Sequence, residues 1–198
     1  MAKRQKVLQF HIALDGIEPA VWRRIQLPDD STFWDLHCAI QDAFGWQDCH
    51  LHEFLLGQEP DLRVGILNDE DLIDEDDDEC LPGWEISVQE NLELGEAFLY
   101  VYDFGDDWVH HVKLEKVCEA APGKKYPICL EGERACPPED SGGAPGYAEF
   151  LKAIRNPKHP EHKNMLEWIG KSFDPESFDP EEVRFSDPTE RLAVVGLG

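Results

Sequence analysis

The 198-residue sequence has few basic residues and no long apolar run. It contains 18 Lys and Arg against 42 Asp and Glu, which gives a formal net charge of −24. Because Lys and Arg supply most non-specific affinity for phosphate backbones, this charge argues against direct nucleic-acid binding. The longest apolar runs span only a few residues, so we expect no membrane span. The basic start lacks the apolar stretch of a signal peptide, and we expect a cytoplasmic location.

Several signatures of nucleotide, hydrolase and metal sites are also absent. The sequence has no Gly-x-x-x-x-Gly-Lys-Ser/Thr loop, no Gly-x-Gly-x-x-Gly fingerprint and no Gly-x-Ser-x-Gly elbow. Its six cysteines include no Cys-x-x-Cys pair, which weakens a structural zinc site. Without a secretory signal we expect most of these cysteines to be free thiols. No short motif therefore identifies a reaction.

The apolar pattern predicts an α+β fold. Alternating apolar residues predict strands at 7–14, 20–27, 50–56, 97–102 and 108–117, with a shorter one at 64–67. Apolar residues three or four apart predict a helix over 33–44, capped by Ser31 or Asp30 and ending at Gly45. This order of elements resembles a β-grasp sheet, so we predict a β-grasp-like mixed sheet with one crossing helix.

Three regions are expected along the chain. Residues 5–118 form the β-grasp-like α+β core, and an acidic stretch within it, 69–83, is expected to be a solvated loop. Residues 119–185 are read as a Pro/Gly-rich loop followed by a C-terminal helical extension packed on the core. Residues 186–198 are expected to be a flexible tail.

Two histidines stand close together in the strand predicted at 50–56. If that strand includes both, His50 and His52 share one face while Glu53 takes the other. Two imidazoles spaced in this way can bind a metal ion. The alternative is a partly buried strand whose histidines hydrogen-bond to their neighbours.

A hairpin predicted around residues 102–111 carries acids, histidines and aromatics. Its acids are Asp103, Asp106 and Asp107, and they are followed by Trp108 and His110. Carboxylates and an imidazole in one hairpin can bind a divalent ion or form an acid–base pair. The alternative is that Asp and Gly are there only because turns favour them.

The loop after residue 128 adds thiol, guanidinium and carboxylate groups. Cys136 offers a thiolate ligand if histidines from elsewhere approach it. Arg134 has the planar donor set that clamps a carboxylate or phosphate. The alternative is a rigid loop in which this arginine pairs with nearby acids.

We predict that these segments converge on one cleft, because burying so many polar groups is costly unless they bind each other or a ligand. The cleft residues are His50, His52, Glu53, Asp103, Asp106, Asp107, Trp108, His110, Arg134, Cys136, Glu139 and Asp140. Within that set the metal ligands are predicted to be His50, His52, Asp103 and His110. The expected cofactor is a divalent metal ion.

Longer motifs in the same segments resemble a known family. They are Pro19-x-Val21-Trp22-Arg23-Arg24, Leu36-His37-x-x-Ile40-Gln41, Gly45-Trp46, His50-Leu51-His52-Glu53-Phe54, Tyr102-Asp103-Phe104-Gly105-Asp106-Asp107-Trp108-x-His110, Gly132-Glu133-Arg134-Ala135-Cys136-Pro137-Pro138-Glu139-Asp140-x-Gly142-Gly143 and Gly146-Tyr147. Over residues 7–185 the chain resembles the plasmid pRiA4b ORF-3-like family, also described as insertion-element passenger proteins. The resemblance implies an association with mobile elements and no established activity.

Two functions are compatible with these residues. The first is a protein-binding or adaptor module, whose aromatic and acidic face docks a basic protein or peptide. That face consists of Trp22, Trp46, Tyr102 and Trp108 with the neighbouring acids. The second is a metal-dependent, hydrolase-like enzyme that uses a His/Asp site. An adaptor requires an exposed apolar patch, whereas an enzyme requires a bound metal ion and a pocket.

Overall fold

The computed structural model describes residues 5–57, 62–66, 80–170 and 172–194. Its strands are β1 (Lys6–Leu14), β2 (Trp22–Pro28), β3 (His52–Leu56), β4 (Leu62–Ile66), β5 (Cys80–Pro82), β6 (Ala97–Tyr102), β7 (Trp108–Glu119) and β8 (Ile128–Glu133). Its helices are α1 (Phe33–Phe44), α2 (Val88–Asn91), α3 (Gly143–Arg155), α4 (His162–Ile169), α5 (Pro188–Val194) and the short 3₁₀ helix η1 (Pro180–Glu182). Most of the acidic stretch at 69–83 lies outside the described residues.

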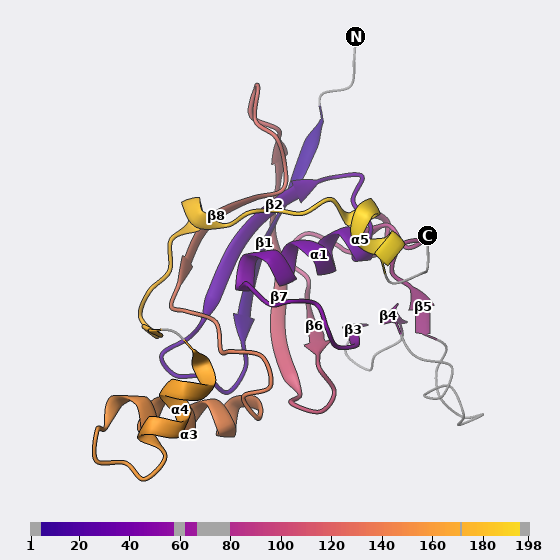
Figure 1. Cartoon of the computed structure of the whole chain (residues 1–198). Helices are drawn as coiled ribbons and strands as arrows, with labels where there is room; N and C mark the ends of the chain where they lie inside the picture. The colour runs from indigo at the N-terminus through magenta and orange to yellow at the C-terminus, as the bar shows by residue number, and fades with distance from the viewer. Residues whose placement is uncertain (1–4, 58–61, 67–79, 171, 195–198) are drawn as a thin grey trace, which may run out of the picture.

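The described strands form one sheet of eight in the order β5-β4-β3-β6-β7-β1-β2-β8 (Figure 1). Its neighbouring strands are antiparallel except for the parallel pair β4 and β5 at one edge. The α+β class is therefore confirmed, with a mostly antiparallel sheet. No helix in the described ranges has both the length and the apolar character needed to cross a membrane.

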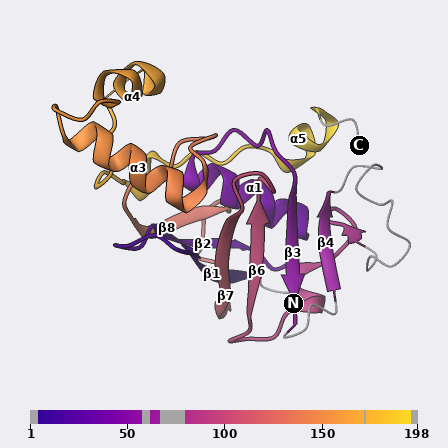
Figure 2. The same cartoon turned by 90° about the horizontal axis from the view of Figure 1, so that it is seen from below.

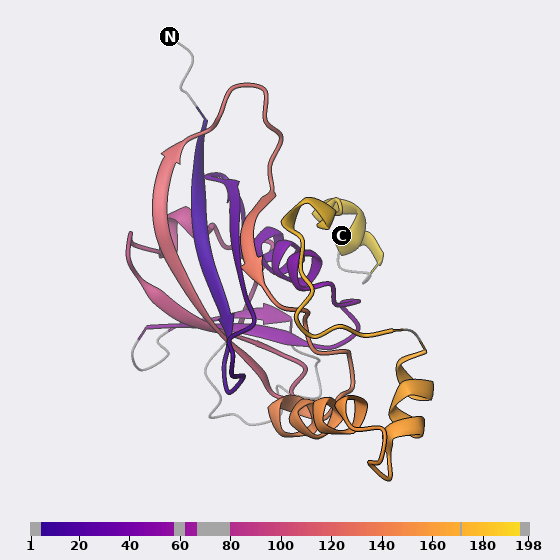
Figure 3. The same ribbon diagram turned by 90° about the vertical axis from the view of Figure 1, so that its left-hand side faces the viewer.

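Helix α1 crosses one face of this sheet and α5 lies on the same side (Figures 2 and 3). The four apolar residues from which the α1 helix was predicted, at 33, 36, 40 and 44, are all buried. The N-cap is Thr32 rather than Ser31 or Asp30, because Thr32 and Asp35 form a reciprocal capping box. Gly45 ends the helix with a φ of 88°, a left-handed conformation that glycine adopts without steric cost.

Three elements occur where sequence patterns indicated loop or tail. Strand β5 lies inside the expected loop at 69–83 and pairs with β4. Strand β8 lies inside the Pro/Gly-rich loop predicted at the start of residues 119–185, and it is a short edge strand that pairs with β2. Helix α5 lies inside the expected tail and packs against α1. There Trp34 Nε1 donates to Pro188 O at 2.8 Å, and Arg191 pairs with Asp42 at 2.7 Å and with Asp48 at 3.5 Å. These contacts are long-range, so local periodicity does not predict them.

Arg23 joins the sheet, α1 and the C-terminal segment. Its side chain points into the core from β2 and is 1% exposed. The Nε atom donates to Ala43 O at the end of α1, at 2.8 Å. The two terminal nitrogens donate to three further carbonyls, those of Trp22 at 2.8 Å, Glu133 at 3.0 Å and Arg134 at 2.9 Å.

Aromatic rings cover the Arg23 guanidinium. The Phe178 ring centroid lies 3.6 Å from the guanidinium carbon and that of Phe44 lies 4.9 Å away. Gly132 permits this approach, because a Cβ there would lie 2.5 Å from the Phe178 ring and 2.9 Å from Arg23 Cδ. Burial lowers the pKa of Arg23 to about 10, so the buried group remains a cation at neutral pH.

We predict that Arg23→Met destabilises the protein far more than Arg24→Met. Removing the Arg23 guanidinium leaves several buried carbonyls unpaired, for a loss of about 3 kcal/mol or more in the free energy of unfolding. Arg24 is the matched control: it pairs with Glu115 and Glu131 near the surface, where such pairs contribute about 1 kcal/mol or less. Urea unfolding of both variants measures the difference. Equal losses would contradict the role given to Arg23.

Candidate functional site

A cluster of carboxylate and thiol side chains, which are potential metal ligands, surrounds His50 just before β3. His50 Nε2 is 3.5 Å from Asp103 Oδ2 and 3.3 Å from Asp140 Oδ1. Ligand atoms of these three residues lie within 4.8 Å of one another, and so do those of Cys49, His50 and Glu139. Because the two groups share His50, one imidazole faces four further donor groups.

The turn after β6 positions Asp103. Its backbone N–H donates to Leu51 O at 2.9 Å, which holds the hairpin against the segment that carries His50. Its Oδ1 atom accepts from the backbone N–H of Gly105 at 3.0 Å and of Asp106 at 3.3 Å. The turn therefore fixes one carboxylate oxygen and leaves Oδ2 facing His50.

The loop between β8 and α3 brings Glu139 to the same place. Glu139 Oε1 accepts from Gln47 N at 2.7 Å and from the Tyr102 hydroxyl at 3.1 Å. Its Oε2 atom is buried and has no hydrogen-bond partner. A buried carboxylate oxygen without a partner is costly, so this atom is suited to receive a cation or a proton.

The same loop is docked on the β6–β7 hairpin. Gly142 N donates to Asp106 Oδ2 at 2.9 Å, at the start of α3. The next residue, Gly143, has no room for a side chain, because a Cβ there would collide with Asp106 O. Asp140 has a φ of 54°, a left-handed backbone that Asp tolerates better than most residues. Close backbone packing thus fixes the direction from which Asp140 reaches His50.

The cluster carries an excess of negative charge. Among the residues that the structure describes, no Lys or Arg side chain pairs with Asp103, Glu139 or Asp140. Burial raises the pKa of the Glu139 carboxyl. Imidazole and carboxylate donors within a few ångströms are a set that Zn²⁺, Mn²⁺ and Fe²⁺ accept. The arrangement can therefore bind a divalent cation.

Some of the predicted cleft residues meet at this cluster. His50, Asp103, Glu139 and Asp140 contribute donor groups, and Asp106 lies next to them through its bond to Gly142. Cys49 belongs to the same cluster and was not among the predicted residues. Its position beside His50 in the chain is the only sequence signal that pointed to it. Its exposed thiol is the soft donor that favours zinc.

The two other predicted metal ligands lie in the core instead. His50 precedes β3, so strand alternation does not place it on the face of His52. His52 is buried and stacks on His37, with ring centroids 3.5 Å apart. His110 is buried beneath α1, and its Nδ1 atom lies 2.9 Å from Trp108 O. Neither imidazole is within reach of the donor groups that surround His50.

The remaining predicted residues have separate partners. Glu53 pairs with Arg63 at 2.9 Å, and Arg134 pairs with Glu176 at 3.0 Å. Trp108 is 1% exposed and packs against Trp46, with ring centroids 5.9 Å apart. Asp107 holds the hairpin turn, where its backbone N–H donates to Asp103 O at 2.6 Å.

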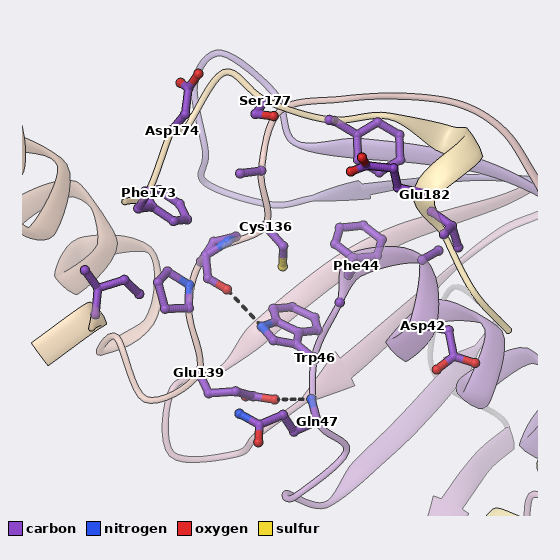
Figure 4. A pocket seen from close by; sticks show the side chains of 18 of the residues that line it. Asp42, Phe44, Trp46, Gln47, Cys136, Glu139, Phe173, Asp174, Ser177 and Glu182 are labelled. Atoms are coloured by element: carbon purple, nitrogen blue, oxygen red, sulfur yellow. Dashed lines mark hydrogen bonds between the residues drawn. The ribbon is translucent and has the colours of Figure 1, made fainter. Parts of the chain in front are cut away.

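A pocket of about 860 Å³ opens beside the cluster (Figure 4). It lies between the end of α1, the loop after β8 and the segment that follows α4. Cys136, the one predicted cleft residue not yet placed, lines this pocket together with Trp46. Trp46 Nε1 donates to Pro137 O at 3.0 Å. Glu139 and Asp140 line the pocket and also belong to the cluster, so the two are continuous.

Comparison with known proteins gives a family match and two relatives. Residues 6–182 match the family described as "Plasmid pRiA4b ORF-3-like protein". The "Uncharacterized protein y4hQ" of Sinorhizobium fredii (strain NBRC 101917 / NGR234) is 39% identical over 166 residues, which cover 84% of this chain and 82% of the relative. The crystal structure of "Protein of Unknown Function MM3350 from Methanosarcina mazei Go1" is 38% identical, with a TM-score of 0.81, and the match covers 92% of this chain and 100% of that one.

The buried histidines predict a loss of stability in mild acid. Burial lowers the pKa of His110 from 6.5 to about 3, and it also lowers the pKa values of His37 and His52. Below pH 6.5 the unfolded chain therefore binds more protons than the folded protein does. The stability that the uncharged histidines contribute is present above pH 6.5 and is lost as the pH falls below that value. Between about pH 8 and pH 5, His110 alone accounts for a loss of about 2 kcal/mol.

Urea unfolding across that pH range tests this prediction. In His110→Asn the side-chain amide still offers a donor, and the decline between pH 8 and pH 5 should shrink by about 2 kcal/mol. His111→Asn is the matched control, because the neighbouring imidazole is exposed on the other face of β7. A decline as steep in His110→Asn as in the unaltered protein would refute the assignment.

Proposed function

Because this chain belongs to the plasmid pRiA4b ORF-3-like family, whose description names no activity, we propose a function from the geometry of its own residues. The two relatives of this chain described above are called uncharacterized or of unknown function. The protein binds one divalent metal ion through His50, Asp103 and Asp140. It uses that ion to hydrolyse a substrate held in the adjoining pocket. The observation that carries this proposal is the convergence of an imidazole and two carboxylates within 4.8 Å, beside a pocket.

The residues around the cluster supply the other requirements of hydrolysis. A divalent ion activates water and polarises the bond that is broken. Glu139 has an unpartnered carboxylate oxygen and a raised pKa, so it is suited to accept a proton from water. The Tyr102 hydroxyl and the Gln47 N–H hold its other oxygen in place. The proposal thus gives each buried polar group of the cluster a partner or a task.

We predict that the protein, purified without a metal-affinity tag, binds about one Zn²⁺ or Mn²⁺ per chain. Asp103→Asn should weaken binding at least about tenfold, because it removes a charged ligand. Asp107→Asn is a closely matched control: both residues lie in the same hairpin with left-handed backbones, at φ of 57° and 54°, and only Asp103 faces His50. Calorimetric titration of EDTA-treated protein measures both affinities. Equal binding by the two variants would refute this site.

We also predict hydrolysis that depends on the metal ion. With p-nitrophenyl acetate and bis(p-nitrophenyl) phosphate as general probes, the metal-loaded protein should be active and the EDTA-treated protein inactive. Glu139→Gln should slow turnover about 100-fold, because it removes the proton acceptor. Glu133→Gln, in an exposed position at the end of β8, should leave turnover unchanged. Turnover that persists in EDTA would contradict metal-dependent hydrolysis.

A second proposal is a protein-binding or adaptor role with a basic protein or peptide as partner. The aromatic face first considered for it is mostly covered, because Trp46, Trp108 and Tyr102 are buried. What supports the role instead is the pocket, whose lining combines aromatic rings with carboxylates. The association with mobile elements and the likeness to a β-grasp sheet stay predictions that bear on neither role.

A further inference from the structure

The pocket beside the cluster has aromatic walls. Five aromatic side chains line it: Phe44, Trp46, Trp168, Phe173 and Phe178. Trp168 on α4 is 47% exposed and contacts Phe150 edge-on, with ring centroids 5.6 Å apart. A solvent-facing indole at a pocket wall is a surface on which a cation or a flat group can stack.

Carboxylates outnumber cations around the same pocket. Six acidic residues line it against two arginines. The acids are Asp42, Glu139, Asp140, Asp174, Asp179 and Glu182. Asp174, Asp179 and Glu182 are exposed on the segment that forms one wall, opposite the loop that carries Glu139. The formal charge of the whole chain, −24, has the same sign as this local charge.

The arginine that lines this pocket at its buried end does not offer a site for an anion. Four hydrogen bonds to backbone carbonyls occupy the edges of the Arg23 guanidinium. Phe178 covers one of its faces at 3.6 Å. The second arginine, Arg184, turns its Nη1 atom to the carbonyls of Glu181 and Val183. Both positive charges are thus engaged within the protein, whereas the exposed carboxylates face the solvent.

We propose that the pocket formed by α1, the loop after β8 and the segment after α4 binds the guanidinium group of an arginine in a short basic peptide. The cation stacks on Trp168 and is neutralised by Asp174, whose neighbour Phe173 packs on Phe150 as Trp168 does. A volume of about 860 Å³ is large enough to hold the flanking residues of the peptide as well. This inference deepens the protein-binding role above and does not rest on the metal ion.

The test compares two peptides that differ only in charge. Acetyl-Gly-Arg-Gly-amide carries the guanidinium, and its citrulline counterpart has nearly the same shape without the charge. Calorimetric titration of the full chain in EDTA should show binding of the arginine peptide at least about tenfold tighter than binding of the citrulline peptide. The affinity for the arginine peptide should also fall several-fold when NaCl is raised from about 50 to about 500 mM.

Two pairs of variants locate the binding. Asp174→Asn should weaken binding about threefold, whereas Asp187→Asn should not change it, because Asp187 is exposed outside the pocket lining. The two aspartates are matched, since each accepts a hydrogen bond from the backbone N–H two residues further along the chain. Trp168→Leu should weaken binding about tenfold, whereas Leu166→Ala, also exposed on α4 and outside the lining, should not. Circular dichroism of each variant checks that the fold is intact.

The outcomes separate this inference from the role on which it rests. If the arginine peptide binds and the two pocket variants bind it as tightly as their controls do, the pocket is the wrong site and the protein-binding role survives. If the arginine and citrulline peptides bind equally, or neither binds at millimolar concentration, recognition of a basic peptide is itself refuted. Metal binding measured on Asp103→Asn is independent of both results.

Discussion

The buried guanidinium of Arg23 is the interaction on which the rest of the architecture depends. A strand, a helix end and an edge strand each supply carbonyl groups that need a donor, and one planar cation supplies donors to all three. Phe178 then places the C-terminal segment over that cation. Because α1 ends there and the loop after β8 begins there, the same contact sets the relative position of the two segments that form the pocket.

The candidate site depends on backbone packing more than on the side chains that carry its chemistry. Asp103 and Asp140 come from separate turns, each with a left-handed backbone, and both face an imidazole from a third segment. Glycines at the start of α3 permit the close contact that brings these turns together. The carboxylates are therefore held near one another before any cation arrives, and the protein bears the cost of their repulsion.

The fold class and several elements were predictable from local patterns, whereas the contacts between distant segments were not. The periodicity of α1 and its stop at Gly45 are local properties, and both are confirmed. Strand β8 was missed because it is a short edge strand in a Pro/Gly-rich region, defined by its pairing with β2. The predicted pairing of His50 and His52 on one strand face was wrong for a related reason: the strand begins at His52, two residues later than predicted, so strand alternation does not extend to His50.

The position of α5 has a consequence for how this protein can be divided. The family match stops at residue 182, before the helix that covers α1. A fragment trimmed to that boundary would lose the acceptor of the Trp34 indole and leave Asp42 and Asp48 near each other without Arg191. The family match and the contacts of α1 thus end at different places in this chain, and an expression fragment that keeps the native surface of α1 has to run through residue 194.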